Sequence, residues 1–95
     1  MSAPVNRREL TAIGPEGAFT VTGQVAKALA ALVAAESRGV TALEVATWAY
    51  RLGAYVHTLR HRHGLSIETR REPHEGGWHG RYVLRSPVTI GEARQ

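Results

Sequence analysis

The sequence predicts an α+β domain with a three-helix core and a two-stranded β-hairpin at its C-terminal end. Three observations lead to this fold class. Apolar residues recur at helical spacing between residues 20 and 63, the spacing changes to alternation after Gly64, and a glycine-rich segment separates two alternating runs. The length of 95 residues fits one domain. We expect an N-terminal arm over residues 1–19, the folded domain over 20–86 and a C-terminal tail over 87–95.

The first helix is expected to begin after Thr20 or Thr22 and to end near Glu36. Alanine, the best helix former, is frequent here, and the apolar side chains at helical spacing are Val25, Leu29, Leu32 and Val33. Residues 1–19 show no apolar period and contain two prolines and two glycines, which is why we expect an arm there.

Two further helix signals follow. Thr41 and Glu44 are spaced as a capping box, in which each side chain accepts a hydrogen bond from the other residue's backbone N–H. The box opens a short second helix, Ala42 to about Thr47. The third helix is expected over about Tyr50–His63, and its apolar face carries Leu52, Val56 and Leu59. Gly64 closes this helix, because glycine readily adopts a left-handed C-cap.

The C-terminal third alternates as strands do. Residues 65–70 and 81–85 each alternate apolar with polar side chains, and the segment 73–80 between them is a glycine-rich turn. Val40 is expected to form a very short strand, and residues 88–90 a short edge segment. The second half of the domain is therefore predicted as a β-hairpin.

The order of helix, short strand, capped helix, long helix and glycine-tipped hairpin resembles the winged helix-turn-helix superfamily. The residues that carry the resemblance are Gly39–Glu44, Arg51–Leu65, Ile67–Arg70 and Gly80–Leu84. They span about residues 20–86 and look like small bacterial and phage winged-helix proteins. The resemblance implies duplex DNA binding with the third helix in the major groove, the wing on the backbone or minor groove, and a role in transcription regulation. The turn over residues 46–50 departs from the pattern, since it has no glycine and two bulky aromatic residues.

The charge of the chain is unevenly distributed. The net charge is +4, and residues 51–85 hold seven arginines, three glutamates and all five histidines, while residues 1–50 sum to zero. A basic half beside a neutral half is typical of a surface that binds a polyanion. The alternative is a composition biased toward arginine, since a single lysine stands among the twelve basic residues.

In a DNA-binding interpretation, the third helix turns the face opposite its apolar stripe toward the groove. That face and its flanks carry the candidate residues Tyr50, Arg51, Gly53, Ala54, His57, Thr58, Arg60, His61 and Arg62. The wing, with its loop over Glu72–Gly80, adds Arg70, Arg71, His74, Trp78, His79 and Arg81, whose phosphate contacts would fix register without reading sequence. The alternatives are a solvated edge for the arginines, and for Trp78 either a partner surface or packing back onto the wing.

Catalysis and cofactors find little support. The chain has no cysteine and no aspartate, so a zinc–thiolate site or a Ser-His-Asp triad cannot form, and we expect no enzyme and no cofactor. His57 and His61 are spaced to chelate a metal, but His74 or His79 could supply a third ligand only if the wing folded over the helix, so we expect no metal site. No apolar run approaches the roughly 18 residues of a membrane span, and we expect a cytoplasmic protein without a small-molecule substrate.

The expected partners are double-stranded DNA and a second protein chain. A domain of this size reaches few base pairs, so we expect a homodimer or a partner protein. The second hypothesis is a winged-helix adaptor that contacts proteins through the small residues of the third helix and Trp78. RNA binding through a basic wing is a third hypothesis.

Overall fold

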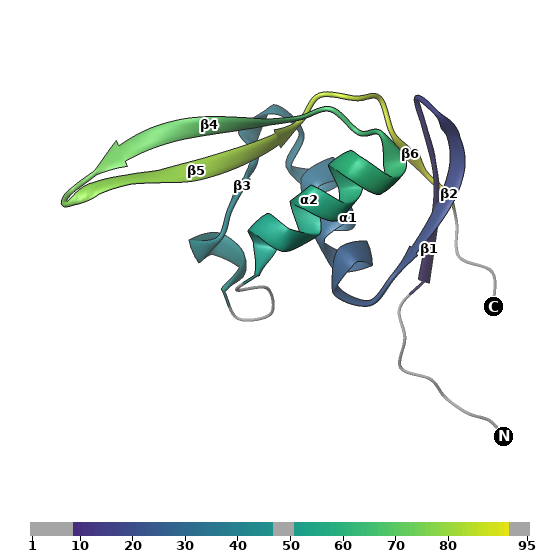
Figure 1. Cartoon of the computed structure of the whole chain (residues 1–95), viewed down its shortest axis with the longest axis horizontal. Helices are drawn as coiled ribbons and strands as arrows, with labels where there is room; N and C mark the ends of the chain where they lie inside the picture. The colour runs from purple at the N-terminus through teal and green to yellow at the C-terminus, as the bar shows by residue number, and fades with distance from the viewer. Residues whose placement is uncertain (1–8, 47–50, 92–95) are drawn as a thin grey trace, which may run out of the picture.

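Two helices lie between two small antiparallel sheets in the computed structural model, which describes residues 9–46 and 51–91 (Figure 1). One sheet has the strand order β2-β1-β6 and the other β3-β5-β4. The α-helices are α1 (Gly23–Ala35) and α2 (Leu52–His63), and single 3₁₀ turns are η1 (Glu36–Arg38) and η2 (Leu43–Val45). The strands are β1 (Glu9–Gly14), β2 (Gly17–Thr22), β3 (Val40–Thr41), β4 (Ile67–His74), β5 (Gly77–Leu84) and β6 (Thr89–Ile90).

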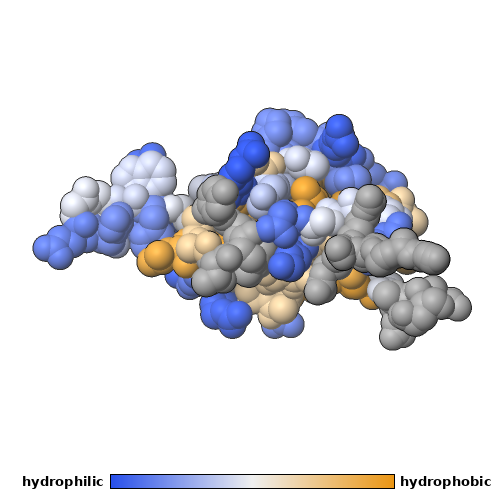
Figure 2. Space-filling view, turned by 90° about the horizontal axis from the view of Figure 1, so that it is seen from below, coloured by the Kyte–Doolittle hydropathy of each residue, from blue (hydrophilic) through white to orange (hydrophobic). Residues whose placement is uncertain are grey.

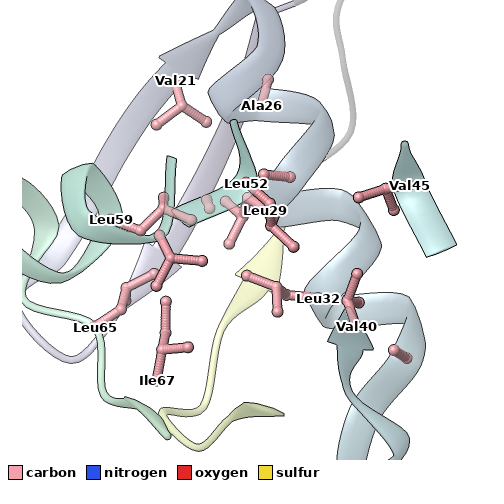
Figure 3. Packing of buried hydrophobic residues seen from close by; sticks show 14 residues of the cluster. Val21, Ala26, Leu29, Leu32, Val40, Val45, Leu52, Leu59, Leu65 and Ile67 are labelled. Carbon is pink, nitrogen blue, oxygen red and sulfur yellow. The ribbon is translucent and has the colours of Figure 1, made fainter. Parts of the chain in front are cut away.

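The core forms where the two helices meet (Figure 3). Its fully buried large side chains are Leu29 and Leu32 from α1, Leu52, Val56 and Leu59 from α2, and Val83 from β5. Each such side chain stabilises the fold by about 1.5–3 kcal/mol relative to exposure. The apolar faces predicted for the first and third helices are therefore confirmed.

The ends of both α-helices agree closely with the sequence analysis. Thr22 occupies the N-cap position of α1, although its side chain makes no capping hydrogen bond, and the helix ends at Ala35, one residue before the expected end. Gly64 closes α2 in the left-handed conformation with φ 66° and ψ 24°. Tyr50, the expected first residue of this helix, lies outside the described residues.

The second predicted α-helix is wrong over its described residues. The capping box is present, since Thr41 N donates to Glu44 Oε1 (3.0 Å) and Glu44 N donates to Thr41 Oγ1 (3.2 Å). It opens only η2, whose bonds join residues three apart, as in Ala46 N to Leu43 O. Val45 is buried but Leu43 is 84% exposed, so this segment has no apolar face for a full helix. The described residues thus contain two α-helices, and the three-helix core is not confirmed.

The N-terminal segment is more regular than expected. Residues 9–19, expected to belong to an arm, form β1 and half of β2, which pair antiparallel around the turn at residues 15–16. Ala12 and Val21 are buried on the inner side of this sheet. Strand β6, from the expected tail, pairs with β1 through Ala12↔Ile90 and Ile13↔Thr89. The segments expected as arm and tail therefore meet in one sheet.

The predicted hairpin and short strand are confirmed, with longer strands than expected. β4 and β5 pair from Ile67↔Leu84 to His74↔Gly77, so residues 73–80 are mostly strand and the turn shrinks to residues 75–76. The hairpin projects away from the helices (Figure 1). β3 pairs with the base of β5. Gly39 precedes β3 with φ 74°, and a Cβ there would lie 2.8 Å from the Tyr82 carbonyl oxygen, so only glycine fits.

Over residues 9–46 and 51–91, no helix is long and apolar enough to cross a membrane.

Candidate nucleic-acid interface

Helix α2 has one buried face and one open face. Leu52, Val56 and Leu59 are fully buried. The exposed residues of the helix and its N-cap are Arg51, Gly53, Ala54, His57, His61 and Arg62. At 100° per residue, Ala54, His57 and His61 lie opposite the core, while Arg51 and Arg62 share one flank. The small side chain at position 54 leaves the helix surface open to a close neighbour.

The hairpin base contacts the other flank of α2. Thr69 and Tyr82 lie opposite each other in the hairpin register and therefore on one face of it. Arg60 Nη2 donates to Thr69 Oγ1 (2.7 Å), and Arg60 Nε donates to the Ile67 carbonyl oxygen (3.0 Å). The Tyr82 hydroxyl lies 3.4 Å from where a Cβ at Gly53 would stand. The base of the hairpin therefore contacts α2 through the face that carries Thr69 and Tyr82.

That face continues outward from Thr69 and Tyr82. We call it the helix-side face of the hairpin, and it consists of the pairs Thr69 and Tyr82, Arg71 and Gly80, and Pro73 and Trp78. The guanidinium carbon of Arg71 lies 4.3 Å from the centre of the Trp78 ring, a cation–π contact across the two strands. Trp78 is still 54% exposed. The ring therefore packs back onto the hairpin while keeping part of its surface open.

The opposite face of the hairpin holds paired charges, and we call it the ion-pair face. Arg81 donates from Nε to Glu72 Oε2 (2.7 Å) and from Nη1 to Glu44 Oε2 (3.3 Å). Glu72 Oε1 lies 3.0 Å from His79 Nε2. Glu68 Oε1 accepts from Arg85 and lies 3.7 Å from Arg70 Nη2. This face therefore neutralises much of the positive charge of the hairpin.

The ionisation of these groups follows from the pairing. Hydrogen bonding from Arg81 lowers the pKa of Glu72, and Arg85 does the same to the pKa of Glu68. The same contact with Glu72 raises the pKa of Arg81. Both carboxylates therefore stay ionised at neutral pH, and the ion pairs are present at the pH at which a nucleic acid would bind.

A family model described as a winged helix domain matches residues 18–94. The chain belongs to the winged helix domain family. Comparisons with curated proteins and with solved structures give no match. The match extends beyond the expected domain of residues 20–86. It includes strand β6, which pairs with β1 of the N-terminal hairpin. The family match suggests a helix-turn-helix module that binds DNA.

The charge excess seen in the sequence divides into two sets in this winged helix domain. Arg70, Arg81 and Arg85 lie within 4 Å of carboxylates. Within the described ranges, no carboxylate pairs with Arg51, Arg62 or Arg71. The visible face of the projecting hairpin is hydrophilic to intermediate in hydropathy (Figure 2). The unpaired arginines thus lie along α2 and the helix-side face of the hairpin.

The remaining candidates take other positions. Arg60 is tied to β4, and the Thr58 hydroxyl donates to the Ala54 carbonyl oxygen (3.2 Å). His74 lies on the ion-pair face, with its ring 5.1 Å from that of His79. The rings of His57 and His61 lie 4.2 Å apart on the open face of α2. Among the described residues, no group of three potential ligands could hold a metal ion.

Tyr82 and Thr69, which join the hairpin to α2, were not among the candidate residues predicted from the sequence. Their contacts depend on the hairpin register, with Thr69 opposite Tyr82. The alternation in both strands carries this information once the turn is placed at residues 75–76.

Proposed function

We propose that this winged helix domain binds duplex DNA, with α2 in the major groove and the β4–β5 hairpin as the wing along the backbone or minor groove. The observation that carries the proposal is the surface formed by the open face of α2 and the helix-side face of the hairpin. Arg51 and Arg62 on one flank of α2, and Arg71 on the hairpin, have no carboxylate partner among the described residues. A helix of about 10–12 Å diameter fits a major groove about 12 Å wide.

The contacts follow from the position of each side chain. Ala54 lets the helix approach the base edges, and His57 and His61 can hydrogen-bond to them. Arg51 and Arg62 on one flank, and Arg71 on the wing, contact phosphates on either side of the groove. The proposal also includes Thr58 on α2, Trp78 on the wing and Arg60, whose guanidinium binds β4. Its last members are Arg70, His74, His79 and Arg81 on the ion-pair face, which act through the hairpin, and Tyr50, which lies outside the described residues.

The biological role in this proposal is transcription regulation in a bacterium, a phage or another mobile element, in the cytoplasm. The domain acts as a homodimer or with a partner protein, because one α2 reaches only a few base pairs. It needs no cofactor and catalyses no reaction.

The test is fluorescence anisotropy with a pool of random DNA duplexes and RNA duplexes of the same sequences. We expect tighter binding to DNA, because the deep, narrow major groove of RNA excludes a helix. Arg51→Ala weakens binding to all duplexes about equally, since phosphates carry no sequence. Absence of binding to any DNA duplex at low salt overturns the proposal, and equal or tighter binding to RNA favours an RNA-binding role.

A protein-binding adaptor is the second candidate, and an apolar groove favours it. Leu43 is 84% exposed beside a cavity of about 400 Å³ between η2 and the hairpin. Its other lining residues are Thr41, Ala42, His74, His79, Gly80 and Tyr82. Leu43→Glu leaves DNA affinity unchanged if DNA is the partner. If this variant loses transcription regulation in cells while its DNA affinity is intact, the adaptor is favoured.

A further inference from the structure

Strand β2 has a free edge. It ends the sheet β2-β1-β6, and no described strand pairs with its outer side. Its six residues, Gly17–Thr22, include no charged residue and no proline, and Phe, Val and Thr favour extended structure. A long, uncharged edge strand is a template for pairing with another chain.

The backbone groups at this edge can be assigned from β1. Thr11 O accepts a hydrogen bond from Gly91 N on the β6 side, so the Thr11 backbone points away from β2. Thr20 lies opposite Thr11, and the two form a non-hydrogen-bonded pair of the antiparallel ladder. In such a pair, the backbone N–H and C=O groups of each residue point away from the other residue. The N–H and C=O of Thr20, and by alternation those of Ala18, therefore point to the free edge of β2.

The other edges of the molecule are protected or short. On β4, the Ile67 carbonyl oxygen is bound by Arg60, and the strand continues through charged residues to Pro73. Charges, proline and capped backbone groups are the usual protection of an edge strand. β3 and β6 have two residues each, and beyond β3 the free side of β5 covers only Gly77–Gly80. β2 is thus the long described edge without such protection.

The surroundings of β2 leave room for a neighbouring strand. A shallow hollow of about 190 Å³ runs beside Thr20–Thr22 and is bordered by Val25, Thr58 and Arg62. A second hollow of about 120 Å³ runs beside Gly17–Phe19. Glu16 and Arg62, of opposite charge, flank this second hollow.

We propose that two copies of this chain pair through β2, antiparallel, around a two-fold axis at Thr20. Thr20 then lies opposite its own copy, Ala18 lies opposite Thr22, and the two sheets become one continuous sheet. A second copy fits because an uncharged strand pairs with itself without like-charge contacts, and a Thr–Thr pair is favourable. The axis is perpendicular to the sheet, so both helix layers lie on the same side. This inference concerns assembly and does not rest on DNA binding.

The variant that tests it most sharply is Thr20→Pro. Proline removes an N–H that points outward and leaves the β1–β2 ladder intact, a position where edge strands tolerate proline. Thr20→Lys places two like charges opposite each other at the axis. The matched control is Thr89→Lys, which adds the same charge to the same outer face of the sheet, on β6.

Sedimentation velocity without DNA, from micromolar to submillimolar chain concentration, is the measurement. We expect the unchanged chain and Thr89→Lys to reach twice the chain mass of 10.3 kDa, as dimers do. Both Thr20 variants are expected to remain monomers of 10.3 kDa. Circular dichroism checks that each variant is folded. A monomeric unchanged chain overturns the proposal, as does a folded Thr20→Pro or Thr20→Lys variant that still dimerises, or equal loss of the dimer in Thr89→Lys.

Discussion

Two adjacent arginines of the hairpin differ in what surrounds them. Arg71 lies on the helix-side face, where its guanidinium stacks on Trp78 and has no carboxylate partner among the described residues. Arg70 lies on the ion-pair face, 3.7 Å from Glu68. Arg71→Ala and Arg70→Ala remove the same charge from neighbouring positions of one strand. We expect only Arg71→Ala to remove a phosphate contact.

The magnitude follows from counterion release. Each lost phosphate contact reduces the slope of log affinity against log salt by about 0.9, which is about a 3.5-fold change in relative affinity between about 50 and 200 mM salt. Anisotropy titrations across salt measure this slope. For Arg71→Ala we expect a slope about one smaller than for the unchanged chain, and for Arg70→Ala a slope within error of it. Equal slopes for all three proteins, or a larger change in Arg70→Ala, would refute the assignment of faces.

Three further predictions concern the fold. Arg60→Ala lowers the free energy of unfolding by about 1 kcal/mol, because β4 loses a charged hydrogen-bond donor, whereas Arg62→Ala on the same helix changes it by less than about 0.5 kcal/mol; urea unfolding compares them. Thr41→Ala costs about 1 kcal/mol through loss of the capping hydroxyl and Thr41→Ser much less, so equal losses in urea unfolding would count against the capping box. The third prediction is that stability is lost in two steps as the pH is lowered. Burial, with Arg62 nearby, lowers the pKa of His63, so stability falls as the pH drops below the ordinary value of 6.5. The Thr41 backbone N–H lowers the pKa of Glu44, so a second loss occurs below its ordinary value of 4.5. Melting temperatures across pH check both steps, and His63→Gln removes the first; a profile unchanged by this variant would contradict it.

Local signals in the sequence were sufficient for some elements. The apolar face of α2 and its glycine cap depend on residues within a few turns of one another, and both were predicted. The capping box was also predicted, because Thr41 and Glu44 are three residues apart. The length of the helix that follows was wrong, since a cap sets where a helix begins and tertiary packing sets how far it continues.

Contacts between distant segments were the main loss. The alternation in β1 is disguised because Ile13, an apolar residue, is 58% exposed on the outer side of its sheet. The partner of Arg81 on η2, Glu44, is 37 residues away, so no local pattern reveals it. The contact between Arg71 and Trp78 was hidden by an expected eight-residue turn, although the register of the longer strands implies it.

The central claim is that one continuous surface, formed by α2 and the helix-side face of the hairpin, binds duplex DNA. Amide chemical shifts of the isotope-labelled chain, titrated with a duplex selected from the random pool, test it most directly. We expect the largest changes at Ala54, His57, His61 and Arg71 and at the indole N–H of Trp78, with small changes on β1. Shift changes confined to the ion-pair face or to the apolar groove beside Leu43, or none with any duplex at low salt, would contradict this claim.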